Sequence, residues 1–134
     1  MVYVIAINAY RKPGTSASFF KDHYENKHVP LVRSIAGDTF PLSHKRHYIQ
    51  RDAQDKAAMM VGDAAQFPVD AFATLTFSDE GAFQSFMGKV TATDAAAKIA
   101  QDEEIFLDRG RMAVVVLGDV QETSMHDSGN GSGL

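Results

Sequence analysis

The stretch FFKDHYENKHVPL, residues 19–31, places a histidine on the apolar face of an amphipathic helix, just before a proline. Phe20, Tyr24 and His28 are spaced four apart, so their side chains share one side of that helix. Pro30 disfavours helical geometry at the residue before it and favours a new helical start. We therefore predict a helix that kinks at His28 and holds this imidazole where a pocket would lie. The alternative is a core histidine that is hydrogen-bonded to a backbone carbonyl.

The flanking sequence alternates strand patterns with helix patterns. Runs of β-branched and aromatic residues predict strands, and apolar residues three and four apart predict helices. The expected elements are strands over 2–9, 43–51, 70–77 and 111–117, and helices between Thr15 (the N-cap) and Gly37, from Ser78 to Val90, and over 94–108 with Thr93 as N-cap. A long connection, 52–68, joins the second and third strands. The order β-α-β-β-α-β predicts an α+β, ferredoxin-like fold with a four-stranded antiparallel sheet and the helices of both α units on one face.

The other face of such a sheet needs a cover that one chain of this size does not supply. We expect a second copy of the chain to provide it, sheet packed against sheet, in a two-fold homodimer.

Composition narrows the class of protein. The 134 residues fit one domain, expected over 1–120, with a mobile tail rich in Ser, Gly, Asn and Asp over 121–134. The lack of cysteine excludes disulfides, thiolate metal sites and a cysteine nucleophile. A net charge of −4 without a basic run gives no reason to expect nucleic acid. No stretch predicts a membrane span or a signal peptide, so we expect a cytoplasmic protein.

The predicted second strand carries a polar, aromatic row on one face. Alternation places one set of side chains on that face (His44, Arg46, Tyr48 and Gln50) and another on the opposite face (Lys45, His47, Ile49 and Arg51). If the first set faces the helices, it joins Tyr24 and His28 around one cavity, which suits a flat, hydroxylated, anionic aromatic ligand. A shift of register by one residue would present the second set instead.

Three segments carry a resemblance to a known family: Tyr10–Gly14, Tyr24–Leu31 with Phe20, and Phe40–Tyr48. Together they resemble the EthD family, in particular its fungal members within the dimeric α+β barrel superfamily, over roughly Val2 to Val120. The resemblance implies a ligand between the helices and the sheet of each subunit. It also implies a role in aromatic polyketide pathways, where several similar fungal proteins are regarded as decarboxylases of anthrone-type carboxylic acids. Relatives with this barrel include oxygenases, cyclases, isomerases and haem enzymes, so the fold alone does not choose the reaction.

Decarboxylation of a β-keto or hydroxyaryl acid needs a cation for the carboxylate, an acid for the carbon left behind, and apolar walls. Arg46 offers the cation, His28 or His44 the proton, and Tyr48 or Tyr24 a hydrogen bond to the developing enolate. We therefore expect a cofactor-free decarboxylase of a small aromatic polyketide. Its expected catalytic residues are His28, His44, Arg46 and Tyr48, and its expected substrate-binding residues are Phe20, Tyr24, Asp70 and Phe83.

Several alternatives stay open. The same groups could serve a cofactor-free anthrone-type monooxygenase, an isomerase, dehydratase or cyclase, or a non-catalytic polyketide-binding protein. Arg46 could instead pair with Asp70 or Glu80, and Tyr48 could be only a cross-strand packing partner. His23 is expected to be solvated; it lies five residues from His28, a poor spacing for a metal pair. No glycine-rich phosphate loop follows a strand, so we expect neither a metal nor a nucleotide cofactor.

Overall fold

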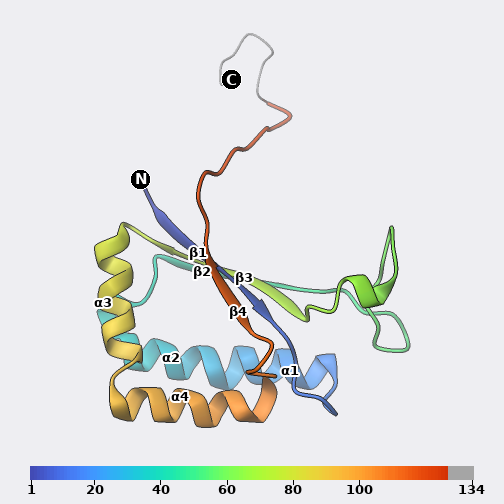
Figure 1. The fold of residues 1–134 in the computed structure, drawn as a ribbon, viewed down its shortest axis with the longest axis horizontal. Coiled ribbons are helices and arrows are strands. Elements are labelled where there is room, and N and C mark those ends of the chain that lie inside the picture. Colours follow the sequence, from blue (N-terminus) through green and yellow to red (C-terminus); the bar gives the residue numbers. More distant parts are fainter. Residues whose placement is uncertain (127–134) are drawn as a thin grey trace.

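The computed structural model describes residues 1–126 and contains one four-stranded antiparallel sheet. The strands are β1 (Tyr3–Ala9), β2 (Ser43–Tyr48), β3 (Ala71–Phe77) and β4 (Ala113–Val116). Their order across the sheet is β2-β3-β1-β4, and each neighbouring pair is antiparallel. This is the predicted ferredoxin-like arrangement (Figure 1).

The helices lie against one face of this sheet (Figure 1). They are α1 (Ala17–His23), the π-helical turn η1 (Tyr24–His28), α2 (Val29–Ala36), α3 (Glu80–Val90) and α4 (Thr93–Phe106), with short 3₁₀ turns η2 (Gly37–Thr39) and η3 (Ala64–Gln66). The connection between β2 and β3 projects to one side as an arm, and the two chain ends leave the sheet on the side away from α2 and α4. No helix within residues 1–126 has the length and apolar character needed to cross a membrane.

In place of the kink predicted at His28, the structure has the π-helical turn η1, which continues directly into α2. The backbone N–H of Val29 donates to the carbonyl of Tyr24, five residues earlier. Pro30 then falls in the first turn of α2, where it lacks the N–H that would continue the hydrogen-bond series, and the π-helical turn accommodates this break. Because the backbone at His28 stays helical, with φ −72° and ψ −52°, the three helical segments form one continuous rod. α2 ends at Gly37, whose φ of 56° favours glycine.

The helix starts differ in detail from the prediction. The N-cap of α1 is Ser16, whose hydroxyl accepts from the backbone N–H of Phe19. The predicted cap, Thr15, instead donates its hydroxyl to a turn carbonyl. Thr93 is the first residue of α4, which has no side-chain cap. The choice between neighbouring Ser and Thr residues depends on where the turn ends, which composition does not specify.

Several predicted ends also differ, and β4 spans Ala113–Val116 rather than 111–117. β2 stops at Tyr48 rather than Arg51, since Arg51 forms an isolated bridge to Ala57 of the arm instead of pairing with β3. α4 stops at Phe106 rather than Asp108, since the backbone N–H of Asp108 donates to the carbonyl of Tyr10.

The register of β2 is the one that brings His44, Arg46 and Tyr48 to the helix side. These residues pair with Leu75, Ala73 and Ala71 of β3, all of them buried. Neighbours across a ladder share a face, so the alternation read from the sequence is confirmed. Lys45 and His47 of the opposite set face away from the helices, and His47 lies against Phe72; Ile49 and Arg51 lie beyond the end of β2.

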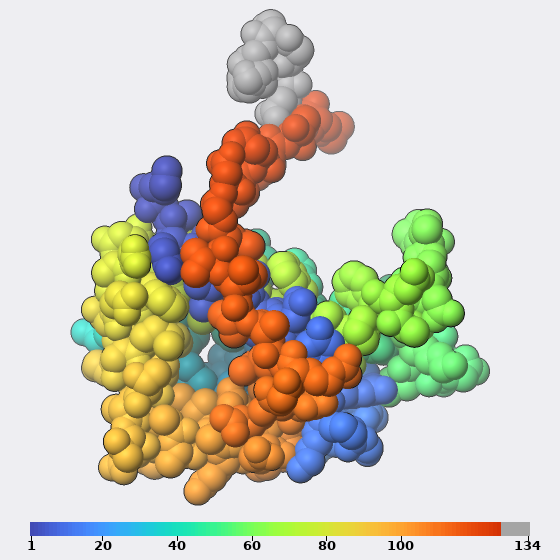
Figure 2. Space-filling model, viewed as in Figure 1, coloured from blue at the N-terminus to red at the C-terminus, as the bar shows by residue number. Residues whose placement is uncertain are grey.

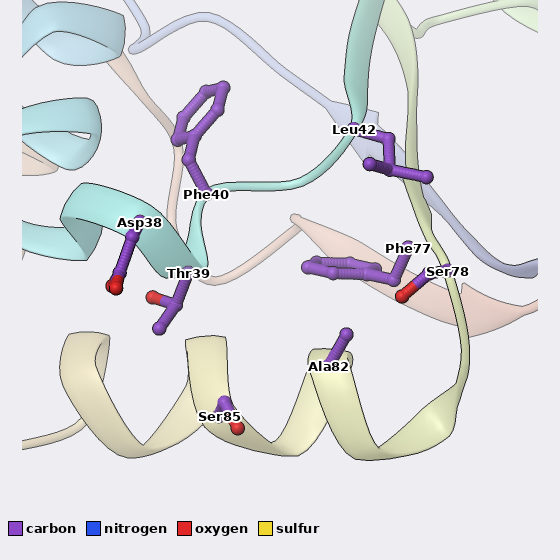
Figure 3. Close-up of a pocket in the computed structure, with 8 residues that line it drawn as sticks. All are labelled: Asp38, Thr39, Phe40, Leu42, Phe77, Ser78, Ala82 and Ser85. Carbon is purple, nitrogen blue, oxygen red and sulfur yellow. The ribbon is translucent and has the colours of Figure 1, made fainter.

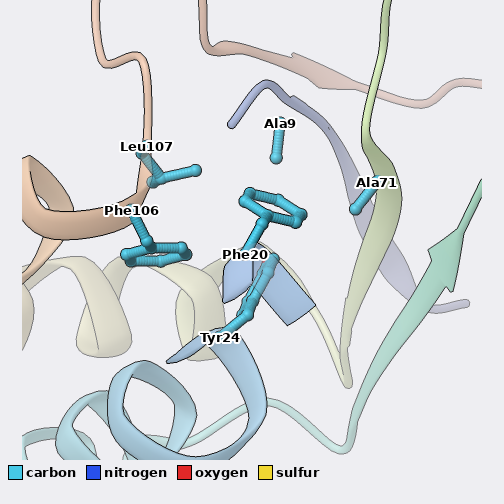
Figure 4. Packing of buried hydrophobic residues seen from close by; sticks show 6 residues of the cluster. All are labelled: Ala9, Phe20, Tyr24, Ala71, Phe106 and Leu107. Atoms are coloured by element: carbon cyan, nitrogen blue, oxygen red, sulfur yellow. The ribbon is translucent and has the colours of Figure 1, made fainter. Parts of the chain in front are cut away.

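Two apolar clusters fill the space between the sheet and the helices. The first gathers around Phe20, whose ring lies between the strand residues Ala9 and Ala71 and the ring of Tyr24 (Figure 4). The second gathers around Phe77 and Phe86. Because no residue of the described chain fills the gap between the two clusters, a cavity remains there.

The outer face of the sheet exposes apolar side chains in the single chain, among them Phe72, 38% exposed, and Val115, 59% exposed. We predict that a second copy covers this face. Phe72→Asp is expected to give a monomer at concentrations where the unmodified chain is a dimer, because it would bury a charge between two apolar sheets. Sedimentation velocity measures this, with Met60→Asp on the exposed arm as the control. A monomeric unmodified chain would contradict the prediction.

Candidate functional site

A cavity of about 350 Å³ lies between the sheet and the helix layer. Its walls are mostly apolar, with Ile5, Leu75, Phe83, Phe86, Met87 and Val90 among them. The ionisable side chains that line it are Tyr24, His28, His44 and Glu103. Figure 2 shows an opening at the surface between α3, α4 and β4. An apolar hollow of this size with a few convergent polar groups is typical of a site for a small molecule.

His28 presents an oriented imidazole to this cavity. Its Nδ1 lies 2.8 Å from Oδ2 of Asp102 on α4. A carboxylate only accepts hydrogen bonds, so Nδ1 carries the hydrogen and Nε2 is the free nitrogen of the neutral ring. No residue of the described chain is hydrogen-bonded to Nε2. An imidazole held this way by a carboxylate is the arrangement of a general base.

The other oxygen of Asp102 binds a second histidine. Oδ1 lies 2.8 Å from Nε2 of His23, and the His23 ring packs on Phe106 with centroids 4.7 Å apart. The expectation that His23 is solvated is therefore wrong, because its side chain is only 11% exposed. α4 packs against the α1–α2 rod at this point, and this packing buries both imidazoles against one carboxylate. The Asp102 side chain is thus held from two sides.

His44 is the second imidazole of the cavity wall. Burial, with smaller contributions from the charges of Arg46 and His28, lowers its pKa from 6.5 to about 4. His44 is therefore neutral at neutral pH. Its Nε2 is buried without a hydrogen-bond partner among residues 1–126. A buried polar atom of this kind is costly, so His44 is well placed to bind a polar ligand atom.

The pKa of His44 predicts a pH dependence of stability. As the pH falls from 6.5 towards 4, the unfolded chain takes up a proton at this residue and the folded chain does not. Folding stability therefore falls over this window, by about 1–2 kcal/mol between pH 7 and pH 5. We expect His44→Gln to remove that part of the loss, measured by urea unfolding at both pH values. An equal loss in the two proteins would contradict the prediction.

Tyr24 adds a hydrogen-bond donor to the cavity. Burial raises its pKa to about 12, against the opposing charge of Arg46. The phenol therefore stays protonated at neutral pH and can donate to a ligand oxygen.

Arg46 and Tyr48 lie on the helix side of β2 but do not line the cavity. Arg46 binds both carboxylate oxygens of Glu25, through Nε at 2.5 Å and Nη2 at 3.0 Å. The hydroxyl of Tyr48 donates to the same carboxylate. The hydrogen bond from Arg46 lowers the pKa of Glu25, and burial raises the pKa of Tyr48.

The alternative partners considered for Arg46, Asp70 and Glu80, are therefore wrong. Glu25 on η1 takes that place, because the π-helical turn carries it opposite β2. With Nε and Nη2 on Glu25 and Nη1 donating to the backbone carbonyl of His44 at 3.0 Å, Arg46 is not a free cation for a substrate carboxylate.

The remaining predicted residues separate. Phe83 lines the cavity, whereas Phe20 is a fully buried core residue outside it. Asp70 lies in another part of the fold, where it accepts from Arg51 at 2.5 Å and from the backbone N–H of Arg11 at 2.9 Å. The structure thus brings together Tyr24, His28, His44 and Phe83, and leaves out Phe20, Arg46, Tyr48 and Asp70. The sequence analysis missed Glu25, Asp102 and Glu103, which carry no local signal because any exposed helix face has similar carboxylates.

A second hollow, of about 300 Å³, lies between the Gly37–Leu42 segment and α3 (Figure 3). Among residues 1–126, Asp38 is the only ionisable side chain that lines it, so this hollow offers less chemistry than the main cavity. Within residues 1–126, no three or more histidine or acidic side chains form a group that could hold a metal ion.

Comparisons with known proteins agree with this fold. Three solved structures each match with a TM-score of 0.54: an ethyl tert-butyl ether D (EthD) family protein from Bacillus halodurans, an EthD-like protein from Ralstonia eutropha, and an uncharacterized NIPSNAP-like domain protein from Burkholderia xenovorans. Their sequence identities are 18%, 14% and 13%; the matches cover 88%, 87% and 92% of this chain and 99%, 87% and 89% of theirs. At such identities the likeness shows the fold alone.

No curated protein matches the chain. Residues 12–110 match the EthD domain, and this range includes the whole α1–α2 rod and the polar wall of the cavity. The chain therefore belongs to the EthD domain family.

Proposed function

We propose that this chain is a cofactor-free acid–base enzyme that moves a proton at His28 Nε2, on a flat, mostly apolar molecule bound in the cavity. The observation that carries the proposal is the arrangement of His28, with Nδ1 fixed by Asp102 and Nε2 free beside apolar walls. Imidazole takes up and releases protons near neutral pH. A positioned acid or base of this kind typically contributes about 10²- to 10⁴-fold to a rate.

Decarboxylation of an anthrone-type or hydroxyaryl acid of a polyketide pathway is the first reaction we propose. In a β-keto acid, the bond from the α carbon to the carboxylate breaks, CO₂ leaves, and the electron pair moves into the ketone; protonated His28 then delivers its Nε2 proton to that carbon. In a hydroxyaryl acid, His28 delivers the proton to the ring carbon first, and CO₂ leaves from the resulting dienone. In both cases Tyr24 donates to the developing oxyanion. The apolar walls favour this dispersed charge over a localised carboxylate.

Proton transfer without loss of CO₂ is the second candidate. It is supported by the engagement of Arg46 with Glu25 and by the presence of Glu103, not a lysine or arginine, in the cavity wall. A substrate carboxylate would meet another carboxylate there. In this case His28 acts first as the base that removes a proton next to a carbonyl, as an isomerase, dehydratase or cyclase requires.

One experiment separates these reactions. The protein is incubated in D₂O, with and without oxygen, with an anthrone carboxylic acid and with the corresponding anthrone, and the products are weighed by mass spectrometry. Anaerobic loss of CO₂ with uptake of one deuterium supports decarboxylation. Deuterium uptake by the anthrone, without loss of CO₂ from the acid, supports the second candidate.

The other outcomes count against the proposal. A gain of one oxygen only in air would make the protein a monooxygenase. Binding without turnover would make it a carrier. Equal acceleration by the His28→Gln variant would overturn the role of His28.

A further inference from the structure

Glu103 places a carboxylate in the wall of an otherwise mostly apolar cavity. It lies on α4, and its side chain is 12% exposed. One oxygen, Oε1, accepts from Nε of Arg109 at 3.1 Å. No residue of the described chain donates to the other oxygen, Oε2. Since Arg109 is itself 44% exposed, this single contact leaves part of the carboxylate without a partner.

A carboxylate oxygen beside apolar walls loses hydration when a ligand fills the cavity, which is costly unless the ligand donates to it. The neighbours of Glu103 in the wall include the apolar side chains of Ile99 and Leu107. A ligand that donates a hydrogen bond to Oε2 would remove this cost. The residue therefore points to a ligand with a donor.

The polar groups of the cavity lie near one another. The charge of Glu103 raises the pKa of Tyr24, and the charge of His28 lowers the pKa of His44. His44 also has a buried Nε2 without a partner in the part of the chain that the structure describes. The Tyr24 ring lies 5.7 Å from the His28 ring and 6.1 Å from the His44 ring, so these polar groups of the wall are close neighbours.

We infer that Glu103 accepts a hydrogen bond from a hydroxyl of the ligand, and that the cavity selects hydroxylated aromatic molecules over analogues that cannot donate. The inference gives the class of substrate for the proposed function. It rests on that function only because both concern the same cavity. A hydrogen bond to a charged acceptor corresponds to about a 10- to 100-fold difference in affinity.

The test compares two probes, 2-naphthol and 2-methoxynaphthalene, which share the ring and the oxygen and differ in the donor. Their dissociation constants are measured by fluorescence titration with the unmodified chain, with Glu103→Leu and with Glu104→Leu. Glu104 is the matched control, because it also contacts Arg109, at 3.5 Å, but is 64% exposed and outside the cavity wall. Circular dichroism checks that each variant is folded.

We expect the unmodified chain and Glu104→Leu to bind 2-naphthol at least about tenfold more tightly than the ether. Glu103→Leu should bind both probes alike, and Glu103→Gln, which keeps an uncharged acceptor, should retain part of the preference. A full preference in Glu103→Leu, no preference in the unmodified chain, or no binding of either probe would overturn the inference. Because the readout is binding, a clear preference together with unchanged activity in His28→Gln would refute the proposed function and leave this inference standing.

Discussion

Replacing His28 by glutamine is expected to lower the rate of proton transfer by about 10²- to 10⁴-fold. Glutamine fills similar space and can still donate to Asp102, but it has no nitrogen that takes up a proton near neutral pH. The loss should fall on kcat, since the apolar walls that hold the ligand are unchanged. Deuterium uptake by the anthrone, or CO₂ release from its acid, measures the effect.

His47→Gln is the matched control for this experiment. His47 is exposed on the opposite face of the same sheet, against Phe72, so its loss should leave the rate unchanged. Asp102→Asn should cost at least about tenfold, because the amide keeps the size of the side chain but no longer fixes the hydrogen of His28 on Nδ1. Activity of His28→Gln close to that of His47→Gln would disprove the assignment.

Replacing Asp70 by asparagine is expected to destabilise the fold by about 3–5 kcal/mol. Asp70 is 8% exposed and joins the end of β3 to Arg51 and to the backbone of Arg11. Arg51 already has a buried Nε without a partner in the described chain. Loss of the carboxylate would leave its guanidinium charge largely buried and uncompensated, which is the expensive half of a broken ion pair.

Urea unfolding at neutral pH measures this loss, with Asp38→Asn as the control, because Asp38 is exposed. The control should change stability by less than about 0.5 kcal/mol. If Asp70→Asn were no less stable than Asp38→Asn, the ion-pair network would be a surface feature without energetic weight. A catalytic loss in a stable Asp70→Asn protein would instead restore Asp70 to the site.

The ordering of strands and helices could be read from the sequence because it depends on local periodicity. The alternation of His44, Arg46 and Tyr48 correctly predicted their shared face, and the spacing of Phe20, Tyr24 and His28 correctly predicted theirs. Side-chain direction follows from helix and strand geometry within a few residues. The ends of elements were less predictable, since Thr15 and Ser16 have equal capping chemistry and only the turn chooses between them.

The partners of the candidate site could not be predicted in this way. Asp102 lies 74 residues from His28 along the chain, and Glu25 and Glu103 look like any solvated helix carboxylates. For Arg46, the face of the strand on which it lies was predictable, but its partner, Glu25, was not. A sequence shows which residues are charged but not which acidic residue a given arginine will pair with. The way the helices and strands pack decides the pairing.

The sequence by itself determined the α+β fold and the polar row that faces the helices, because hydrophobic periodicity fixes which side of each element is buried. Only the tertiary structure decided that His28 is oriented by Asp102, that Arg46 is engaged by Glu25, and that Glu103 enters the cavity. These contacts depend on the angle and offset at which α4 and β2 pack against the α1–α2 rod. Such packing is set by the shape of the whole core rather than by any local pattern.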